Sequence, residues 1–232
     1  MNKLFKLDNR LSVCAEFVRQ DSALADIGTD HAYLPVWLAK KKIIKSAVAA
    51  DVRPLPLKSG RENIEKYNCS DIVTTRLSDG LNEISSGEAD DIVIAGMGAE
   101  LICSIIDRAE WLKNPDKHLI LQPMTKAHVL RKYLTDNGFE IISEKACTHA
   151  GKNYSVMLSV YSGTIKKYDV AFYYIGMLDS EDELAKSYMK QVLKKLTFKS
   201  NGRKHDGKDA SELDKAIDEI KERFGVDLNG NG

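Results

Sequence analysis

The chain has 232 residues, 43% of them hydrophobic, and a formal net charge of zero. This length is enough for one large domain, or for a domain with a smaller appendage, around a buried core. Zero net charge excludes a strong field over the whole surface, so a polyanionic partner would have to bind to a local basic patch.

The cysteines form no metal-binding pattern, because none belongs to a C-x-x-C pair and none has histidines at zinc spacing. We expect reduced thiols and no metal at these positions, which are Cys14, Cys69, Cys103 and Cys147. No apolar run is long enough to span a bilayer or to act as a signal peptide. The sequence therefore predicts a cytoplasmic protein with no membrane partner, and it indicates no obligate protein partner.

The first predicted elements are a helix, a buried strand and a second helix that starts soon after a glycine. Apolar residues at roughly helical spacing predict an amphipathic helix over 7–19, and an apolar run predicts a strand over 23–27. Gly28 allows a tight turn, and Asp30 is a good N-cap for a helix over 30–42 in which Pro35 falls early enough to be tolerated. This arrangement is typical of the cofactor site of an α/β sheet.

The glycine turn does not fit a dinucleotide. That fingerprint needs G-x-G-x-x-G, and here Asp30 and Tyr33 stand at the later glycine positions, so a pyrophosphate would meet a carboxylate. S-adenosylmethionine fits better, because it has no phosphate and carries positive charge that Asp26 and Asp30 would attract. The alternative is that Asp30 only caps the helix and Asp26 only ends the strand.

The second predicted strand, over 46–50, ends at Asp51. An acidic residue about 20 residues after the glycine turn, at the tip of the second strand, can accept both ribose hydroxyls of an adenosine cofactor. The alternative is an ordinary strand-end aspartate. The co-occurrence with Gly28 favours the functional interpretation.

Three more strands follow, each with a polar or glycine residue at its end. A helix over 55–67 leads to a strand over 72–77 that ends in Ser78-Asp79-Gly80, and we expect Asp79 to hydrogen-bond the adenine amino group. A strand over 91–95 runs into Gly96-Met97-Gly98, where two glycines suggest close approach of a ligand. A helix over 100–109 precedes a strand over 118–121 that ends in Gln122-Pro123-Met124.

A helix over 125–137 is followed by strands over 139–145 and 154–161 with no helix between them, which predicts an antiparallel pair at the sheet edge. The strand–helix alternation predicts an α/β fold with a Rossmann-like, doubly wound sheet over 1–163. Open α/β sheets bind ligands at the carboxyl ends of their strands. That edge carries Gly28, Asp51, Asp79, Gly96 and Gln122.

A second region begins near Tyr168. Apolar residues recur every three or four positions in two segments, which predicts an antiparallel, coiled-coil-like helical hairpin over 168–228 with its turn over 200–208. Lysine and arginine dominate residues 186–208, where Asp206 is the only acidic residue. A solvated helix face and a clamp for RNA phosphates are the two interpretations of this surplus.

With these motifs, the sequence resembles the bacterial tRNA adenine-N1 methyltransferases that act on position 22, the TrmK family. The resemblance covers nearly the whole chain, including the helical hairpin. It departs from the family at Ala99, where a glycine is expected and a methyl group could narrow the pocket. The matching segments are Arg10-Leu11, residues 25–35, Ala50-Asp51-Val52, Ala95-Gly96-Met97-Gly98 and Leu121-Gln122-Pro123.

The resemblance implies methyl transfer from S-adenosylmethionine to N1 of adenine 22 in tRNA. N1 has a free lone pair outside a base pair, so alignment and desolvation matter more than a strong base. The Asn/Asp-Pro-Pro-aromatic motif of amino-methylating enzymes is missing after the fourth strand. We expect Gly96-Met97-Gly98 to line the base pocket, Asp30 to hold the adenine amino group or tune the cofactor, and Tyr33 or Tyr154 to stack on the base.

Three sets of site residues follow. The predicted catalytic residues are Asp30, Tyr33, Gly96, Met97 and Gln122. The predicted cofactor-binding residues are Arg10, Leu11, Asp26, Gly28, Thr29, Asp30, His31, Asp51, Val52, Asp79, Gly80, Gly96, Met97 and Gly98, although His31 could instead be a packing residue. The predicted RNA-binding residues are Lys152, Asn153, Tyr154, Lys194, Lys195, Lys199, Arg203 and Lys204.

Two other functions stay open at this stage. The chain could methylate a small molecule with S-adenosylmethionine, in which case the hairpin would be structural. It could also be a non-enzymatic protein that binds a nucleotide or RNA.

Overall fold

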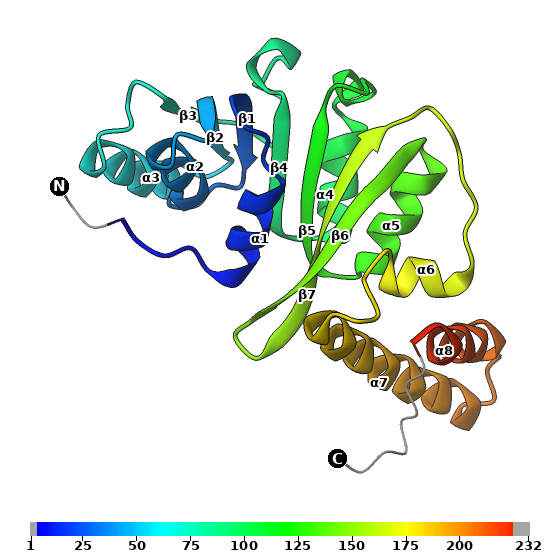
Figure 1. The fold of residues 1–232 in the computed structure, drawn as a ribbon. Helices are drawn as coiled ribbons and strands as arrows, with labels where there is room; N and C mark the ends of the chain where they lie inside the picture. Colours follow the sequence, from blue (N-terminus) through cyan, green and yellow to red (C-terminus); the bar gives the residue numbers. More distant parts are fainter. Residues whose placement is uncertain (1–3, 225–232) are drawn as a thin grey trace.

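The computed structural model describes residues 4–224 and contains a seven-stranded sheet with helices on both faces (Figure 1). The strands are β1 (Ser22–Ile27), β2 (Ile44–Asp51), β3 (Val73–Leu77), β4 (Asp91–Gly98), β5 (His118–Thr125), β6 (Phe139–His149) and β7 (Lys152–Tyr161). The helices are α1 (Asn9–Phe17), α2 (Tyr33–Lys40), α3 (Pro54–Lys66), α4 (Ala99–Asp107), α5 (Ala127–Asp136), α6 (Val170–Ile175), α7 (Glu183–His205) and α8 (Ser211–Phe224), with short 3₁₀ turns η1 (Ser86–Glu88) and η2 (Glu110–Leu112). Within residues 4–224, no helix is long and apolar enough to cross a membrane.

The strand order is β3-β2-β1-β4-β5-β7-β6. Strands β1 to β5 are parallel, whereas β7 runs antiparallel to both of its neighbours. The chain direction across the sheet reverses between β1 and β4, which is the switch point where doubly wound sheets bind ligands. The prediction of a Rossmann-like sheet with an antiparallel edge pair is confirmed.

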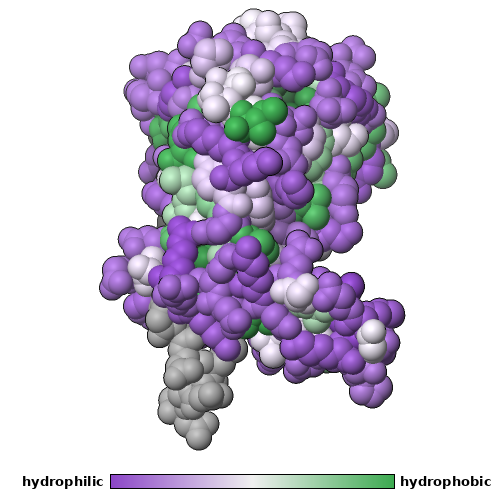
Figure 2. Space-filling view, turned by 90° about the vertical axis from the view of Figure 1, so that its right-hand side faces the viewer, coloured by the Kyte–Doolittle hydropathy of each residue, from purple (hydrophilic) through white to green (hydrophobic). Residues whose placement is uncertain are grey.

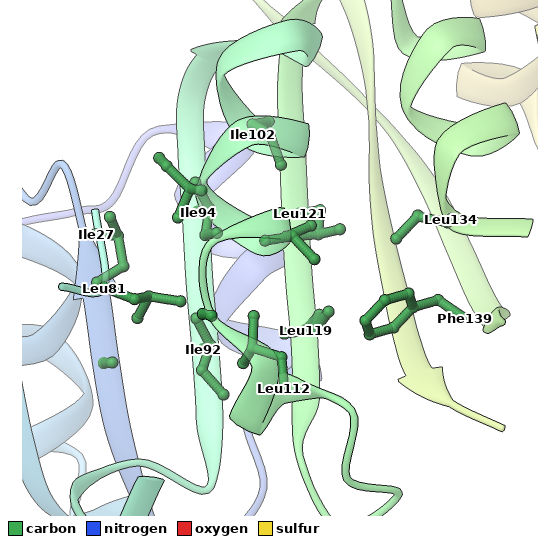
Figure 3. Close-up of a cluster of buried hydrophobic side chains, with 14 of the residues drawn as sticks. Ile27, Leu81, Ile92, Ile94, Ile102, Leu112, Leu119, Leu121, Leu134 and Phe139 are labelled. Atoms are coloured by element: carbon green, nitrogen blue, oxygen red, sulfur yellow. The ribbon is translucent and has the colours of Figure 1, made fainter. Parts of the chain in front are cut away.

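Each face of the sheet packs on its own set of helices. Figure 3 shows one of the two cores, where Ile92 and Ile94 of β4 and Leu119 and Leu121 of β5 lie beside Ile102 of α4. The opposite face packs on α1, α2 and α3. Because β4 is covered on both sides, its first four residues are all buried, which explains the continuous apolar run in the sequence.

The predicted start of the second helix is wrong. Asp30 does not cap it: α2 begins at Tyr33 after Ala32, which is left-handed (φ 54°) and gives no side-chain cap. Ala50 O accepts hydrogen bonds from the N–H groups of Gly28 and Thr29 (2.8 and 3.0 Å). The chain then turns through left-handed Asp30 and Ala32 before it can enter the helix. A longer turn than the sequence pattern suggests therefore separates β1 from α2.

The C-terminal helices lie at the edge of the sheet where β4 and β5 end (Figure 1). Helices α7 and α8 pack together as predicted, and α6, which was not predicted, shares their apolar core. The predicted turn over 200–208 begins too early, because α7 continues to His205 and the turn starts at Asp206. Ser200 is buried inside that helix and its hydroxyl donates to Asp214 at 2.6 Å, so packing on α8 outweighs the roughly 1 kcal/mol that Gly202 costs a helix.

Residues 225–228 of the predicted hairpin lie outside the described residues. Figure 2 shows the side of the molecule that lies on the right in Figure 1. The C-terminal helices form the lower part of this view, and hydrophilic side chains cover most of it.

Candidate functional site

A hollow of about 320 Å³ lies where the ends of β1, β2, β3 and β4 meet. This volume is in the range of about 300–1,000 Å³ that small-molecule sites occupy. The predicted site residues that line it, and so are brought together, are Gly28, Asp51, Val52, Asp79, Gly80, Gly96 and Met97. Arg53, just before α3, and Leu101 and Ile105 of α4 also line it but were not predicted, because nothing in the local sequence distinguishes them from ordinary residues of such segments.

Two glycines open the backbone at this hollow. Gly28 has φ +73° and Gly96 has φ +79°, a region that other residues rarely adopt. A Cβ on Gly28 would lie 2.3 Å from Cε of Met97, so the Met97 side chain covers the glycine turn directly. A ligand in the hollow can therefore approach the main chain at Gly96, and it would contact the Met97 side chain over the Gly28 turn.

The two acidic residues of the hollow differ in their freedom to bind a ligand. Asp51 is buried, and its Oδ1 accepts the Arg53 N–H at 2.9 Å, whereas no donor to Oδ2 is found among the described residues. Asp79 instead receives two hydrogen bonds from Arg108 (2.7 and 3.2 Å), which hold the pKa of its carboxyl below the usual range. Asp51 is thus the carboxylate with an open acceptor, as a ribose contact requires.

Asp26 lies beneath the glycine turn and is not part of the hollow lining. Its carboxylate accepts a hydrogen bond from Thr29 Oγ1 at 2.5 Å, and both residues are buried. Burial raises the pKa of Asp26 to about 6, with a smaller contribution from the nearby charge of Asp51. Through its hydrogen bond with Thr29, this carboxyl joins the end of β1 to the residue that follows Gly28.

The side chains of Asp30, His31 and Tyr33 are not brought into the hollow. Asp30 pairs with His31 at 3.5 Å on the exposed turn before α2. The Tyr33 ring packs edge-on against Phe5, with ring centroids 4.9 Å apart. The geometry therefore gives no support to a direct role of these three side chains at the strand-end hollow.

Gln122 is completely buried and links three elements. Its Oε1 accepts from Gly96 N at 3.1 Å and from Arg10 Nη1 at 3.3 Å, and its Nε2 donates to Pro123 O at 3.0 Å. Arg10 is held in turn by Asp8 at 2.9 Å, and its neighbour Leu11 packs in the core. Gln122 therefore positions the Gly96 turn and is not exposed to a substrate.

Ala99 does not narrow this hollow. It is fully buried at the start of α4, in the core under the sheet, and Gly98 before it is the N-cap of that helix. Neither residue is among those that line the hollow. The departure from the family pattern is thus accommodated in the packing of α4.

A second concavity of about 170 Å³, here called the α7 groove, separates the sheet from the C-terminal helices. One wall is formed by residues 123–128 and 153–155 and the other by α7, with Tyr174 beside them. Predicted RNA-binding residues that line it are Asn153, Tyr154, Lys195 and Lys199. The sequence gave no sign of the residues that complete it, because they come from separate elements.

The groove is basic and partly aromatic. Lys195 and Lys199 have no carboxylate within ion-pair distance in the described part of the chain, while Lys126 pairs with Glu100. The His128 ring stacks on Tyr174, with centroids 4.9 Å apart. Burial lowers the pKa of His128, and the positive charges of Lys199, Arg131 and Lys126 lower it further.

The other predicted RNA-binding residues lie outside the groove. Lys152 and Lys194 are exposed elsewhere, and Lys204 pairs with Asp214 at 2.9 Å. Arg203 lines a neighbouring hollow of about 430 Å³ together with Lys199. Asn153 lines the groove but uses its side chain on α7, where its Nδ2 donates to the Ser187 carbonyl at 3.1 Å.

The hollow and the groove are lined by residues at the ends of the neighbouring strands β4 and β5. Met97, which lines the hollow, pairs in register with Pro123, which lines the groove, and Gly98 pairs with Thr125. Neighbouring strands are about 4.8 Å apart, so the linings of the hollow and of the groove include residues on adjacent strands. Within residues 4–224, no group of three potential ligands among His, Cys, Asp and Glu could hold a metal.

Comparisons with known proteins agree with this geometry. A methyltransferase domain model matches residues 7–157. The tRNA (adenine(22)-N(1))-methyltransferase of Bacillus subtilis is 35% identical over 197 residues, which cover 85% of this chain and 82% of that relative. A crystal structure of a candidate tRNA (m1A22) methyltransferase from Streptococcus pneumoniae, in complex with S-adenosyl-L-methionine, superimposes with a TM-score of 0.80 at 32% identity and covers 93% of this chain and 98% of its own.

The crystal structure of the B. subtilis m1A22 tRNA methyltransferase gives a TM-score of 0.78 at 28% identity, with 96% of this chain and 97% of that chain covered. The similarity therefore includes the C-terminal helices as well as the sheet.

Proposed function

Because the chain belongs to the family of tRNA (adenine(22)-N(1))-methyltransferases, we propose that it transfers a methyl group from S-adenosylmethionine to N1 of adenine 22 in tRNA. The observation that carries this proposal is the junction at Met97 and Pro123. There, a hollow suited to the cofactor adjoins a basic groove suited to RNA.

The residues of the hollow fit S-adenosylmethionine. Asp51 offers a free carboxylate oxygen for the ribose hydroxyls, and the Gly28 and Gly96 turns leave room for close approach of the ligand. When bound, the cofactor supplies an electrophilic methyl group on a positively charged sulfur.

The chain's own contribution to the reaction is alignment and exclusion of water. N1 of an unpaired adenine already has a free lone pair, so no side chain has to remove a proton from it before attack. Met97 and Pro123 stand on the two strands between which the base would enter. Gln122 keeps the Gly96 turn in place by the hydrogen bond to its N–H.

The C-terminal region supplies the contacts to the RNA backbone. Among residues 4–224, Lys195 and Lys199 have no ion-pair partner; they lie at i and i+4 on the same face of α7, and both line the groove opposite the end of β5. Phosphate contacts of this kind position a nucleic acid without reading its sequence. In this division, residues 1–163 bind the cofactor and catalyse, residues 168–228 bind tRNA, and the protein acts in the cytoplasm.

The experiment is to incubate the protein with isotopically labelled S-adenosylmethionine and tRNA transcripts, digest the product and identify the labelled nucleoside by mass spectrometry. We expect label in N1-methyladenosine with adenine at position 22 and none in a matched transcript with guanine there. Binding of the cofactor without label in any nucleoside would refute the proposal and favour a small-molecule substrate.

A further inference from the structure

A buried ion pair joins the sheet to the C-terminal helices. Arg131 of α5 and Glu144 of β6 both have fully buried side chains. Arg131 Nε donates to both carboxylate oxygens at 3.2 Å, and Nη2 donates to Oε1 at 2.5 Å. Neither residue lines the hollow or the groove.

The remaining donors of Arg131 contact three other elements. Nη1 donates to the carbonyl oxygens of Tyr173 and Tyr174 in the last turn of α6, at 2.9 and 2.8 Å. Nη2 also lies within hydrogen-bond distance of Ser155 Oγ on β7 (3.1 Å) and Tyr188 OH on α7 (3.3 Å). The guanidinium group thus contacts α6, α7, β6 and β7 at once.

Glu144, the other member of the pair, contacts the main chain that follows α6. Its Oε2 accepts the N–H of Met177 at 3.2 Å, directly after α6. A Cβ on Gly176 would lie 1.8 Å from the same oxygen, so only glycine lets the chain pass this close. The segment that connects α6 to α7 is therefore fixed against the sheet by its main chain.

Stability alone is a weak reason for such a pair. Removing two charges from water costs free energy that their attraction does not always restore, and apolar residues of similar volume often stabilise as well. A guanidinium fork with matched acceptors on four elements does something that apolar packing cannot, because it fixes their relative positions and angles. Three of the contacted residues, Ser155, Tyr174 and Tyr188, line the α7 groove.

We infer that the Arg131–Glu144 pair is a positioning device that sets the two walls of the α7 groove at the spacing needed to deliver the target base to the strand-end hollow. Arg131 acts through Ser155, Tyr174 and Tyr188 and touches neither RNA nor cofactor. The inference rests on the proposed tRNA methylation. It assigns alignment to this pair and phosphate binding to the groove lysines.

The test replaces Arg131 with lysine and measures kcat and KM for tRNA together with cofactor affinity. Arg131→Lys keeps the charge but loses the fork, so we expect kcat to fall at least about tenfold, while KM for tRNA and the Kd of the cofactor change by less than about threefold. The control is Arg76→Lys, the same change in the half-exposed Arg76–Glu88 pair (2.8 Å) on the far edge strand β3, which should leave all three unchanged.

A second readout needs no activity. Spin labels on cysteines at exposed Glu62 of α3 and Lys190 of α7, in a Cys103→Ala background that removes the one native cysteine that is not buried, report the distance between sheet and C-terminal helices. The distance distribution should be narrow in the parent protein and broader after Arg131→Lys. An unchanged distribution in the folded variant would disprove the positioning role, whether or not tRNA is the substrate.

Tyr188→Phe decides the matter if Arg131→Lys does not fold, because it keeps the ion pair and the ring and removes one hydrogen bond to Arg131. We expect kcat to fall about two- to threefold with KM unchanged. A rise in KM alone would mean that the Tyr188 hydroxyl contacts RNA directly. No change in kcat or KM would mean that the Arg131–Glu144 pair only stabilises the fold. Both results count against the inference, whereas absence of methyl transfer by the parent protein counts against the proposed function.

Discussion

The strand-end hollow and the α7 groove are built in different ways. The hollow is made of short segments at consecutive strand ends, where we propose that the main chain at Gly28 and Gly96 and the Asp51 carboxylate bind the cofactor. The groove is made of side chains from β5, α5, β7, α6 and α7, which only the packing of the C-terminal helices brings together. On this proposal, cofactor recognition depends on the local shape of the backbone, and RNA recognition depends on which charged side chains the tertiary packing brings together.

The largest effect should come from closing the backbone of the hollow. Gly28→Ala forces alanine into φ +73° and displaces the Met97 side chain, whose Cε would lie 2.3 Å from the new methyl group, so we expect the Kd of S-adenosylmethionine to rise about 100-fold. Isothermal titration calorimetry measures it. Gly87→Ala is the control, because nothing lies within 4 Å of a Cβ there. Equal affinity for both variants would show that the hollow does not depend on its main chain.

The contribution of Asp26, which lies beneath the hollow, to the free energy of unfolding should depend on pH. The pKa of Asp26 is about 6 in the folded protein against 3.8 for the free group, so its favourable contribution is fully present below pH 3.8 and is lost as pH rises through 6. Asp26→Asn removes this ionisation and should increase the free energy of unfolding by about 3 kcal/mol at pH 7.5, with a much smaller difference near pH 4. Urea unfolding at both pH values tests this, and a difference independent of pH would exclude the ionisation as its cause.

A single polar group of the hollow should matter less than its backbone. Asp51→Asn keeps the shape and one acceptor but loses the charge, so we expect the cofactor Kd to rise about tenfold. The exposed Asp71→Asn, with the same chemical change, should leave the Kd unaltered. If Asp51→Asn binds as tightly as the parent protein, the ribose contact assigned to this carboxylate is wrong.

Substitution of the groove lysines should have the smallest effect, and this effect should come from the loss of positive charge. We expect Lys195→Gln with Lys199→Gln to raise KM for tRNA about fivefold and to reduce the slope of log affinity against log salt by about 1.4, as for two lost phosphate contacts. Lys190→Gln with Lys194→Gln makes the same charge change on the same helix outside the groove, and its effect should be smaller. Equal effects of the two pairs of substitutions would indicate that RNA binds to a diffuse basic surface of α7 and not to the defined groove.

The difference between the two regions also explains what the sequence could predict. The fold and the hollow were predicted because a glycine turn and carboxylates at strand ends are local signals, and Gly28, Asp51 and Gly96 all line one cavity. The N-cap at Asp30 was wrong because the hydrogen bonds of the Gly28 and Thr29 N–H groups to Ala50 lengthen the turn. Local propensity contains no information on such a contact with the neighbouring strand.

The groove was only partly predictable. The lysines of α7 were visible as a basic run, but the sequence alone does not show that Lys195 faces the sheet while Lys194 does not. Arg131 looks like any residue of an amphipathic helix, and its role depends on Glu144 and on α6, which is too short to be recognised by periodicity. These properties arise from contacts between distant segments.

The central claim is that the α7 groove delivers the target base to the hollow at Met97 and Pro123. Photocrosslinking tests it most directly, with 4-thiouridine placed beside position 22 of a tRNA transcript, bound to the unmodified protein and mapped by mass spectrometry. We predict crosslinks to residues 123–128, 153–155 and the face of α7 that carries Lys195 and Lys199. Crosslinks confined to α3 or to the Lys194 face of α7, with none to the groove, would contradict the account.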